Sequence, residues 1–402
     1  MKIWRAEPEA TPASVGVDAA GLDAMVTELE SALAEGRLFH GAQLAVFRRG
    51  ACVLEAGGGL ARVSAGQPVG PETLFVLYSA TKGLAGLALL MLYERGAFHY
   101  DEPVVKYWPE FASAVPEKAG ISIRHVLSHR AGFPLGPRWL DADHWSDPEA
   151  IRRAMIEIPL RSRPGEKNAY HALNQGHVVD ELCERIDGRR CGRFLREEVF
   201  EPLGLDDLHL GLPEDPALEA RVAWCYNDTA LSSRSTGLAG PEGSEGEGAE
   251  VEPAIPLEQL EREHDFNRLS TWRAGLPAAG GIGSARALAS VYAVLARGGS
   301  DRGVKLVTAD GLAQVTTPTN RADEIDGVIG FPIRWGLGFH VGTHGRGSTL
   351  ATFGHAGMGG QIGFADPDRE LAFAFTTNGE LDPDFLRWRY KLQGMAFSAC
   401  SD

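Results

Sequence analysis

The chain has 402 residues, of which 44% are hydrophobic and 23% are charged, a balance typical of a globular protein with a large core. A formal net charge of −15 argues against nucleic acid or an anionic membrane as a partner. The 5 cysteines are scattered without a Cys-x-x-Cys pair, so neither a disulfide framework nor a zinc knuckle is expected. No apolar run approaches the roughly 20 residues of a membrane span, and the N-terminus lacks the apolar core of a signal peptide. We therefore expect a cytoplasmic protein.

The first part of the chain predicts a helix, a β-hairpin and a second, strongly apolar helix. Leucine, methionine and valine recur at helical spacing before Gly36. Two strand-like runs flank Arg49-Gly50, which favours a tight hairpin. The predicted elements are a helix over 19–34, strands over 43–48 and 52–56, a short strand over 75–78 and a helix that begins at Ser79.

The middle of the chain predicts mostly helices and one exposed loop. The predicted helices cover 121–127, 172–186 and 192–200. Residues 237–256 are rich in glycine and glutamate, which predicts an exposed loop. We interpret the glycine-rich segment 280–283 as a tight turn near the binding pocket.

The last part of the chain returns to strands and closes with a helix. The predicted elements are a helix over 286–297, strands over 336–341, 361–365 and 371–377, and a helix over 384–397. Such an order predicts an α/β (α+β) fold, in which an antiparallel sheet is flanked by the terminal helices. The expected domains are an α/β domain built from 1–78 and 279–402, and a mostly helical domain over 79–278.

The tetrapeptide Ser79-Ala80-Thr81-Lys82 is the only Ser-x-x-Lys in the chain. At the start of a helix, this spacing places both side chains on one face, one turn apart. The Ser79 N–H would be free to bind an oxyanion, and a desolvated Lys82 could accept the hydroxyl proton. The alternative is an N-capped surface helix with a solvated lysine.

Further segments complete an ordered set of motifs around this tetrapeptide, at 100–104, 107–111, 121–129, 170–173 and 353–357. The set resembles the serine β-lactamase and penicillin-binding-protein superfamily, and specifically its class C-like branch, which includes the family VIII carboxylesterases. The resemblance extends from about residue 16 to residue 378. It implies a β-lactamase-like fold and acyl-transfer chemistry without a cofactor.

The resemblance also implies roles for particular residues. Ser79 matches the acylated nucleophile, and Lys82 matches its lysine partner. Tyr170 matches the tyrosine that relays protons in the second motif. His355-Ala356-Gly357 matches the third motif at the edge of the site, and the next residue, Met358, would supply the second oxyanion N–H. Whether Lys82 or Tyr170 is the base stays open at this point, because the two are expected to titrate as a coupled pair.

Two departures from the family pattern bear on the substrate. Ala172 stands where β-lactamases have an asparagine, and His355 replaces the more usual lysine. Both weaken the case for an efficient β-lactamase, so we expect a serine carboxylesterase acting on small or short-chain acyl esters. The alternatives are a β-lactamase or D-amino-acid peptidase-like amidohydrolase and, from a different class, a catalytically silent scaffold. The expected partner is a small-molecule ester, and the oligomeric state is left open.

Three other histidines have competing interpretations. His125 and His129 are four residues apart, as in some zinc sites, but no glutamate completes the pattern and we expect no metal. His171 follows Tyr170 directly, so it either lines the pocket or lies on the surface.

Overall fold

The computed structural model describes residues 3–226, 261, 264–379 and 382–400. The predicted loop at 237–256 lies outside these residues. The predicted N-terminal helix is present as α1 (Ala19–Glu35), because Asp18 accepts the free N–H groups of Ala20 and Gly21, and Gly36 ends the helix with a φ of 63°. The helix therefore begins and ends at the capping residues of its sequence.

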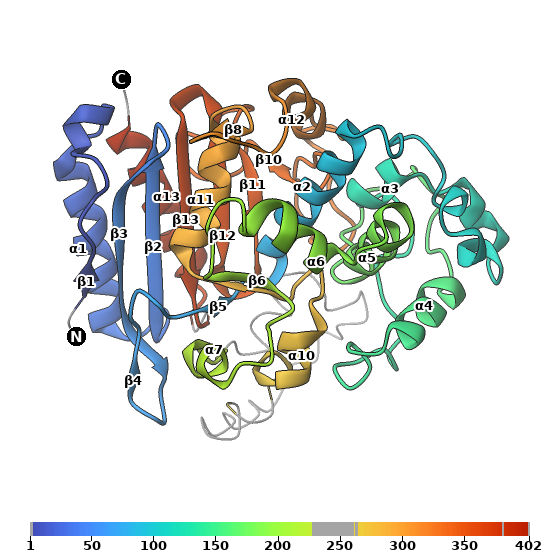
Figure 1. Cartoon of the computed structure of the whole chain (residues 1–402), viewed down its shortest axis with the longest axis horizontal. Coiled ribbons are helices and arrows are strands. Elements are labelled where there is room, and N and C mark those ends of the chain that lie inside the picture. Colours follow the sequence, from blue (N-terminus) through green and yellow to red (C-terminus); the bar gives the residue numbers. More distant parts are fainter. Residues whose placement is uncertain (1–2, 227–260, 262–263, 380–381, 401–402) are drawn as a thin grey trace, which may run out of the picture.

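The described residues form a central antiparallel sheet whose strands come from both ends of the chain (Figure 1). Strand β2 from the N-terminal part pairs with β13 from the C-terminal part over seven residue pairs, from Leu371 opposite Arg48 to Thr377 opposite Ala42. The strand order is β1 (Trp4–Arg5), β3 (Ala51–Arg62), β2 (Gly41–Arg48), β13 (Leu371–Thr377), β12 (Ile362–Asp366), β11 (Phe353–Ala356) and β10 (His340–Val341), with β4 (Gln67–Pro68) paired to β3.

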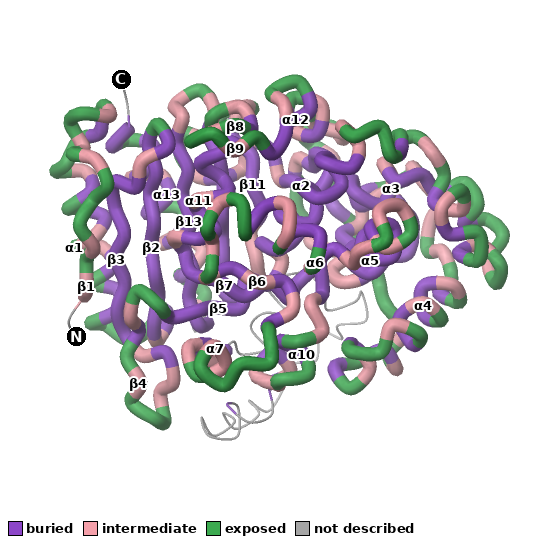
Figure 2. Tube along the Cα trace, in the orientation of Figure 1, coloured by how far each residue is buried: buried purple, intermediate pink, exposed green. Residues whose placement is uncertain are grey.

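Side-chain alternation along the strands separates the two faces of this sheet. In β13 the aromatic residues Phe373 and Phe375 belong to a core shared with α1 and α13 (Phe385–Ala399). The intervening alanines Ala372 and Ala374 belong to the core on the other face, where α11 (Ala285–Ala296) packs. Small residues on that face let α11 lie close to the sheet. Strands β2, β12 and β13 are buried along their whole length, whereas the edge strands β1 and β4 are partly exposed (Figure 2).

The helical region lies beside the sheet and is built around α2 (Thr81–Glu94), most of which is buried. Helix α2 contacts α5, α6, α12 and strand β11, so it connects the helical region to the sheet. The helices of this region and those that follow are α3 (Ile123–Leu127), α4 (Pro148–Glu157), α5 (Asn174–Asp187), α6 (Cys191–Leu195), α7 (Pro216–Arg221), α10 (Leu269–Ala274) and α12 (Ala309–Thr316). Helix α6 continues as one π-helical turn over Arg196–Phe200.

Two small sheets complete the described structure. Strands β5 (Phe75–Val76), β7 (Gly281–Gly283) and β6 (Leu208–Leu210) form the first, and β8 (Ser300–Asp301) and β9 (Val304–Lys305) form the second. The first sheet corrects the prediction of a tight turn at 280–283, because β7 is extended and pairs with both neighbours. A Cβ at Gly281 would lie 2.6 Å from Thr81 Oγ1, so glycine lets this strand run against the start of α2.

One further prediction needs a correction in extent. The strand expected over 336–341 is present only as β10, because Gly338 adopts a φ of 86° and the chain turns there. The mixed α/β architecture with an antiparallel sheet and flanking terminal helices is as predicted, whereas the domain boundaries stay a prediction. Among the described residues, no helix has the length and apolarity that crossing a membrane requires.

Candidate active site

Ser79 lies in a sharp turn where β5 ends and α2 begins. The short 3-10 turn Tyr78–Ala80 runs directly into α2, and Tyr78 adopts a left-handed φ of 43°. This backbone conformation is unfavourable for a bulky residue and persists only where packing holds it. The Tyr78 ring is buried with its centre 4.6 Å from that of Phe266, which supplies such packing. The turn presents Ser79 at the wall of a cavity.

Lys82 follows Ser79 by one helical turn and is fully buried. Its Nζ lies 3.2 Å from Ser79 Oγ, 2.6 Å from the Ala172 carbonyl oxygen and 2.9 Å from the Ala278 carbonyl oxygen. Burial lowers the pKa of Lys82 well below its ordinary value. Two carbonyl acceptors and one hydroxyl match the two N–H bonds and the lone pair of a neutral amine. The surface-helix alternative for this segment is therefore wrong.

Tyr170 approaches Ser79 from the loop that precedes α5. Its Oη lies 2.6 Å from Ser79 Oγ, and Lys82 Nζ lies 4.9 Å from the centre of its ring. The ring stacks on Trp335 with 5.5 Å between centres and 10° between planes. Burial raises the pKa of Tyr170 above its ordinary value. The phenol thus favours its protonated form and donates a hydrogen bond to Ser79 Oγ, while burial favours the neutral amine of Lys82.

The third motif, His355-Ala356-Gly357, ends beside the turn that holds Ser79. Strand β11 leads through Gly357 into a tight turn over Met358–Gly360. A Cβ at Gly357 would lie 2.5 Å from the Leu77 carbonyl oxygen, so only glycine permits this approach to the Ser79 turn. Gln361 holds the turn: its carbonyl accepts from the Gly357 N–H at 2.7 Å, and its side chain accepts from the Thr377 N–H at 3.0 Å. Gly357 and Met358 both line the same cavity as Ser79.

His355 and His171 lie away from the cavity wall. His355 is buried in β11, with Nδ1 2.7 Å from the Ala356 carbonyl oxygen and its ring centre 4.0 Å from that of His340. His171 is also buried, and its Nε2 accepts from the Phe133 N–H at 3.1 Å. Both alternatives predicted for His171 are therefore wrong, because the extended chain that points Tyr170 toward Ser79 turns the next side chain into the interior.

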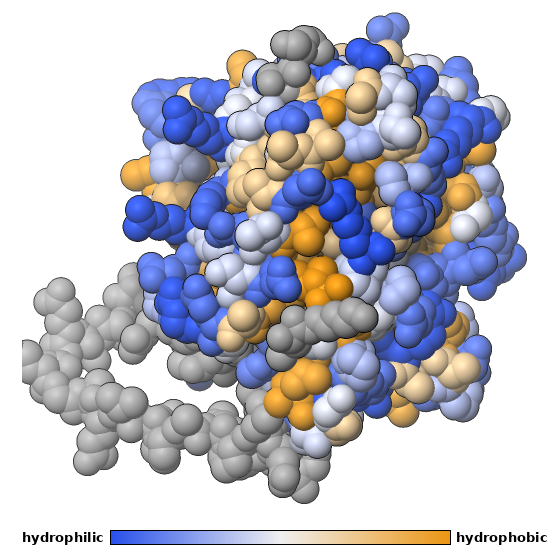
Figure 3. All heavy atoms as spheres, turned by 90° about the vertical axis from the view of Figure 1, so that its left-hand side faces the viewer, coloured by the Kyte–Doolittle hydropathy of each residue, from blue (hydrophilic) through white to orange (hydrophobic). Residues whose placement is uncertain are grey.

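The cavity that contains Ser79 has a volume of about 630 Å³ and mainly apolar walls. Leu135, Phe331 and Tyr390 line it and are exposed by 44%, 48% and 42% of their surface. Among its described lining residues, Arg389 is the one formally charged side chain, and it comes from α13. Figure 3 shows an apolar area set between hydrophilic side chains on the face that it draws. The geometry suits an uncharged, hydrophobic ligand.

Sequence reasoning missed several residues of this site. Trp335 supports the Tyr170 ring, and His177 and Arg389 line the cavity from α5 and α13. Asp326 accepts a hydrogen bond from the Tyr170 N–H at 3.0 Å. His177 follows the motif at 170–173 by four residues, whereas Trp335, Arg389 and Asp326 lie farther from the motifs. The sequence around Asp326 offers only a turn signal at Asp326-Gly327. Their roles follow only from the folded arrangement.

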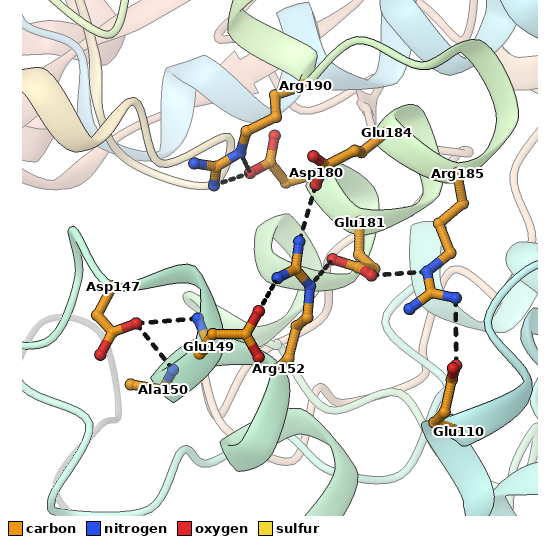
Figure 4. A network of polar contacts seen from close by, with 10 residues as sticks. All are labelled: Glu110, Asp147, Glu149, Ala150, Arg152, Asp180, Glu181, Glu184, Arg185 and Arg190. Atoms are coloured by element: carbon orange, nitrogen blue, oxygen red, sulfur yellow. Dashed lines mark hydrogen bonds and ion pairs between the residues drawn. The ribbon is translucent and has the colours of Figure 1, made fainter.

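A second hollow, of about 640 Å³, lies between α4 and α5 and is lined mainly by charged side chains. Arg152 forms ion pairs with Glu149, Glu181 and Glu184, and Arg185 joins Glu181 from the other side (Figure 4). Its described lining residues include no serine, cysteine, threonine, tyrosine or histidine. The network therefore holds two helices together and offers no nucleophile.

Comparison with known proteins identifies a family and related chains. The family model described as Beta-lactamase matches residues 26–395. The chain is 31% identical over 374 residues to the esterase/β-lactamase LipL of Mycobacterium tuberculosis, covering 90% of this chain and 82% of LipL.

Solved structures show the same fold over nearly the whole chain. A penicillin-binding-protein homologue from Caulobacter crescentus superposes with a TM-score of 0.78 at 31% identity, covering 96% of this chain and 99% of that one. A family VIII carboxylesterase superposes with a TM-score of 0.78 at 26% identity, covering 100% of both chains.

Proposed function

The chain belongs to the β-lactamase family, and from that premise we propose that it is a serine carboxylesterase that forms an acyl-enzyme at Ser79. The observation that carries the proposal is the convergence of two groups on one hydroxyl. Lys82 Nζ lies 3.2 Å and Tyr170 Oη lies 2.6 Å from Ser79 Oγ. A base and an acid in hydrogen-bond reach of one nucleophile are what acyl transfer requires.

In the acylation step, Lys82 acts as the base. Burial favours its neutral form, whose lone pair accepts the Ser79 proton as Oγ attacks the ester carbonyl. The negative charge that develops on the carbonyl oxygen is bound by the backbone N–H groups of Ser79 and Met358. One such donor is worth about 3–4 kcal/mol in the transition state.

Collapse of the tetrahedral intermediate breaks the bond to the leaving alcohol. Tyr170 donates its phenolic proton to the alkoxide, and the Lys82 ammonium then returns a proton to the phenolate. The acyl-enzyme is hydrolysed by a water that attacks the same carbonyl and gives its proton to Lys82. Ser79 Oγ leaves and is protonated by Tyr170, and a proton passing from Lys82 to Tyr170 restores the starting state.

The proposed substrates are uncharged esters with small or short-chain acyl groups. The mainly apolar cavity walls support this class, as do the related chains named as esterases. Ala172 supports it as well, since its methyl group offers no amide to hold the side chain of a β-lactam.

A Ser79→Ala variant tests the proposal directly. We expect it to fold with the wild-type circular dichroism and to lose p-nitrophenyl acetate hydrolysis and labelling by a fluorophosphonate. In the wild type, mass spectrometry of tryptic peptides should place the label on Ser79. Near-normal ester hydrolysis by the alanine variant would exclude this mechanism.

A β-lactamase activity is the second candidate. Two observations favour it: the related protein LipL is named as both esterase and β-lactamase, and Arg389 places a cation in the cavity wall where a substrate carboxylate could bind. Parallel assays with nitrocefin and a p-nitrophenyl ester separate the two activities. A kcat/KM higher for nitrocefin than for the ester would make the β-lactam the better substrate class.

A further inference from the structure

Asp326 is a buried carboxylate joined to the proton donor of the site. Asp326 has no exposed surface, and its Oδ1 accepts a hydrogen bond from the Tyr170 N–H at 3.0 Å. Among the described residues, Asp326 forms no ion pair, and its Oδ2 has no hydrogen-bond partner. A buried carboxylate without a cation is costly, so a structure retains one where its charge or its acceptor geometry is used.

The same oxygen also organises the loop that carries part of the cavity wall. Oδ1 accepts from the Val328 N–H at 2.9 Å and from the Ile329 N–H at 3.0 Å. The loop closes on itself through the Asp326 N–H, which donates to the Phe331 carbonyl at 3.3 Å. Four residues of this loop line the cavity: Ile329, Phe331, Pro332 and Ile333. One carboxylate oxygen therefore connects the Tyr170 backbone to the apolar wall.

On the basis of the proposed function, we propose that Asp326 is a positioning residue that holds Tyr170 as the proton donor to the leaving alcohol. It acts through two routes. The hydrogen bond to the Tyr170 N–H fixes the backbone from which the phenol reaches Ser79. The negative charge of Asp326 disfavours the phenolate and so keeps the proton on Tyr170.

The other groups around Tyr170 are consistent with this role. Lys82 Nζ lies 4.9 Å from the ring centre, and the rings of His129 and His355 lie 4.8 Å and 6.5 Å away, centre to centre. Burial lowers the pKa of each of the three, so each favours its neutral form. The charge of Asp326 adds to burial in raising the pKa of Tyr170.

The test compares two ester substrates that differ in their need for a proton donor. An alkyl ester releases a poor leaving group that must be protonated, whereas a p-nitrophenyl ester releases a good one. We expect Asp326→Ala to lower kcat/KM for the alkyl ester about tenfold more than for the p-nitrophenyl ester. In a Tyr170→Phe background, the same Asp326 change should have no such differential effect. An unchanged ratio, or the same differential in both backgrounds, would overturn the proposal.

Asp326→Asn separates the charge from the hydrogen bonds. The amide oxygen still accepts from the three N–H groups, and the amide nitrogen takes the place of an oxygen without a partner. We expect a ratio of the two substrates near that of the wild type, with activity lost at lower pH on the alkaline side. An alkaline limit identical to the wild type would overturn the charge route. If Asp326→Ala does not fold, this variant still decides the charge route.

Asp366→Asn is the control for removing a buried carboxylate charge away from the site. Asp366 is also fully buried and accepts from a backbone N–H, although it forms an ion pair with Arg369 as well. It lies at the opposite end of β12 from Ile362, which lines the cavity. It should leave both the substrate ratio and the pH limit unchanged. Fluorophosphonate labelling of Ser79 in every variant keeps the two proposals apart. Loss of the Asp326 effect with Ser79 still labelled contradicts only the positioning role, whereas a wild type that is not labelled at Ser79 contradicts the esterase mechanism.

Discussion

At the scale of single residues, the surroundings of Lys82 support the proposal that this lysine removes the serine proton. Its Nζ donates to the carbonyl oxygens of Ala172 and Ala278, and both lie on segments distant from α2. Among the described residues, Lys82 forms no ion pair with a carboxylate, so no opposite charge compensates the desolvation of an ammonium at this position. The site therefore stabilises an amine, which is the form that accepts a proton.

Replacing Lys82 by arginine tests whether the site needs a base or only a positive charge. A guanidinium keeps the charge and the donors but stays protonated in proteins. We expect Lys82→Arg to lose at least about a hundredfold in kcat, as expected for removal of a general base. Steady-state hydrolysis of p-nitrophenyl acetate measures the loss. An arginine variant with more than a tenth of wild-type kcat would assign the base role to another group.

The pH dependence follows from the same shift. Because burial lowers the pKa of Lys82 well below its ordinary value, the lysine is neutral at a lower pH than a solvated lysine. Activity should rise with pH as Lys82 loses its proton and then stay level until Tyr170 ionises, at a pH above the ordinary range of a tyrosine. The profile of kcat/KM from pH 4 to pH 10 measures the acid limit and should stay level at its alkaline end. An acid limit near the pKa of a solvated lysine would contradict a desolvated base.

At the scale of elements, the buried side chain of Lys118 caps the C-terminus of α4. Lys118 has no exposed surface, and its Nζ donates to the carbonyl oxygens of Met155 and Ile156 at 2.7 and 2.8 Å, in the last turn of α4. These carbonyls would otherwise lack partners, and a cation at a helix C-terminus is favourable. Burial nevertheless lowers the pKa of Lys118 from 10.5 to about 8.

This shift predicts how stability changes with pH. The folded-state pKa lies below the unfolded one, so between pH 8 and 10.5 the unfolded chain binds more protons, and the contribution of Lys118 to stability rises with pH. Across this range the gain approaches about 3 kcal/mol. Urea unfolding of the wild type and of Lys118→Met at pH 8 and pH 10 isolates the contribution, because the methionine does not titrate. Equal pH slopes in the two proteins would show that Lys118 titrates normally.

The approach of Gly357 to the nucleophile turn gives a prediction about β11. A Cβ at this position would lie 2.5 Å from the Leu77 carbonyl oxygen. An alanine must therefore push the turn over Met358–Gly360 away from Ser79. We expect Gly357→Ala to lower kcat at least about tenfold, since one misplaced oxyanion donor costs more than that. Gly120→Ala is the control, because no atom lies within 4 Å of its added Cβ. Equal kcat values for both variants and the wild type would contradict the tight fit.

Some contacts of this site follow from local sequence, and others depend on how distant segments pack. Ser79 and Lys82 are one helical turn apart, so their proximity follows from local geometry alone. Tyr170 and Met358 were placed by resemblance to a family, because nothing local brings either of them to α2. The roles of Asp326 and Arg389 were not predictable for a physical reason: their contacts depend on how distant segments pack. The periodicity around Arg389 predicts its helix but not the cavity that the helix lines.

At the scale of the whole molecule, the cavity is a joint product of two regions. The helical region contributes Leu135 and His177, and the α/β region contributes Met358 and Arg389. Helix α2, which begins directly after the turn that holds Ser79, contacts elements of both regions. The cavity therefore lies where the first and last parts of the chain meet the middle part, and its walls beside Ser79 are set by the packing between them.

The apolar walls predict how activity depends on acyl chain length. Each methylene moved from water into such a cavity contributes about 0.8 kcal/mol, or roughly a fourfold gain in kcat/KM, while room remains. We expect kcat/KM to rise from p-nitrophenyl acetate through propionate to butyrate by about this factor at each step. Phe331→Ser, which removes apolar surface at the mouth, should flatten the rise and leave acetate hydrolysis nearly unchanged. A fall in kcat/KM from acetate to butyrate would mean that the acyl chain does not enter the cavity of about 630 Å³ and that its walls bind the alcohol instead.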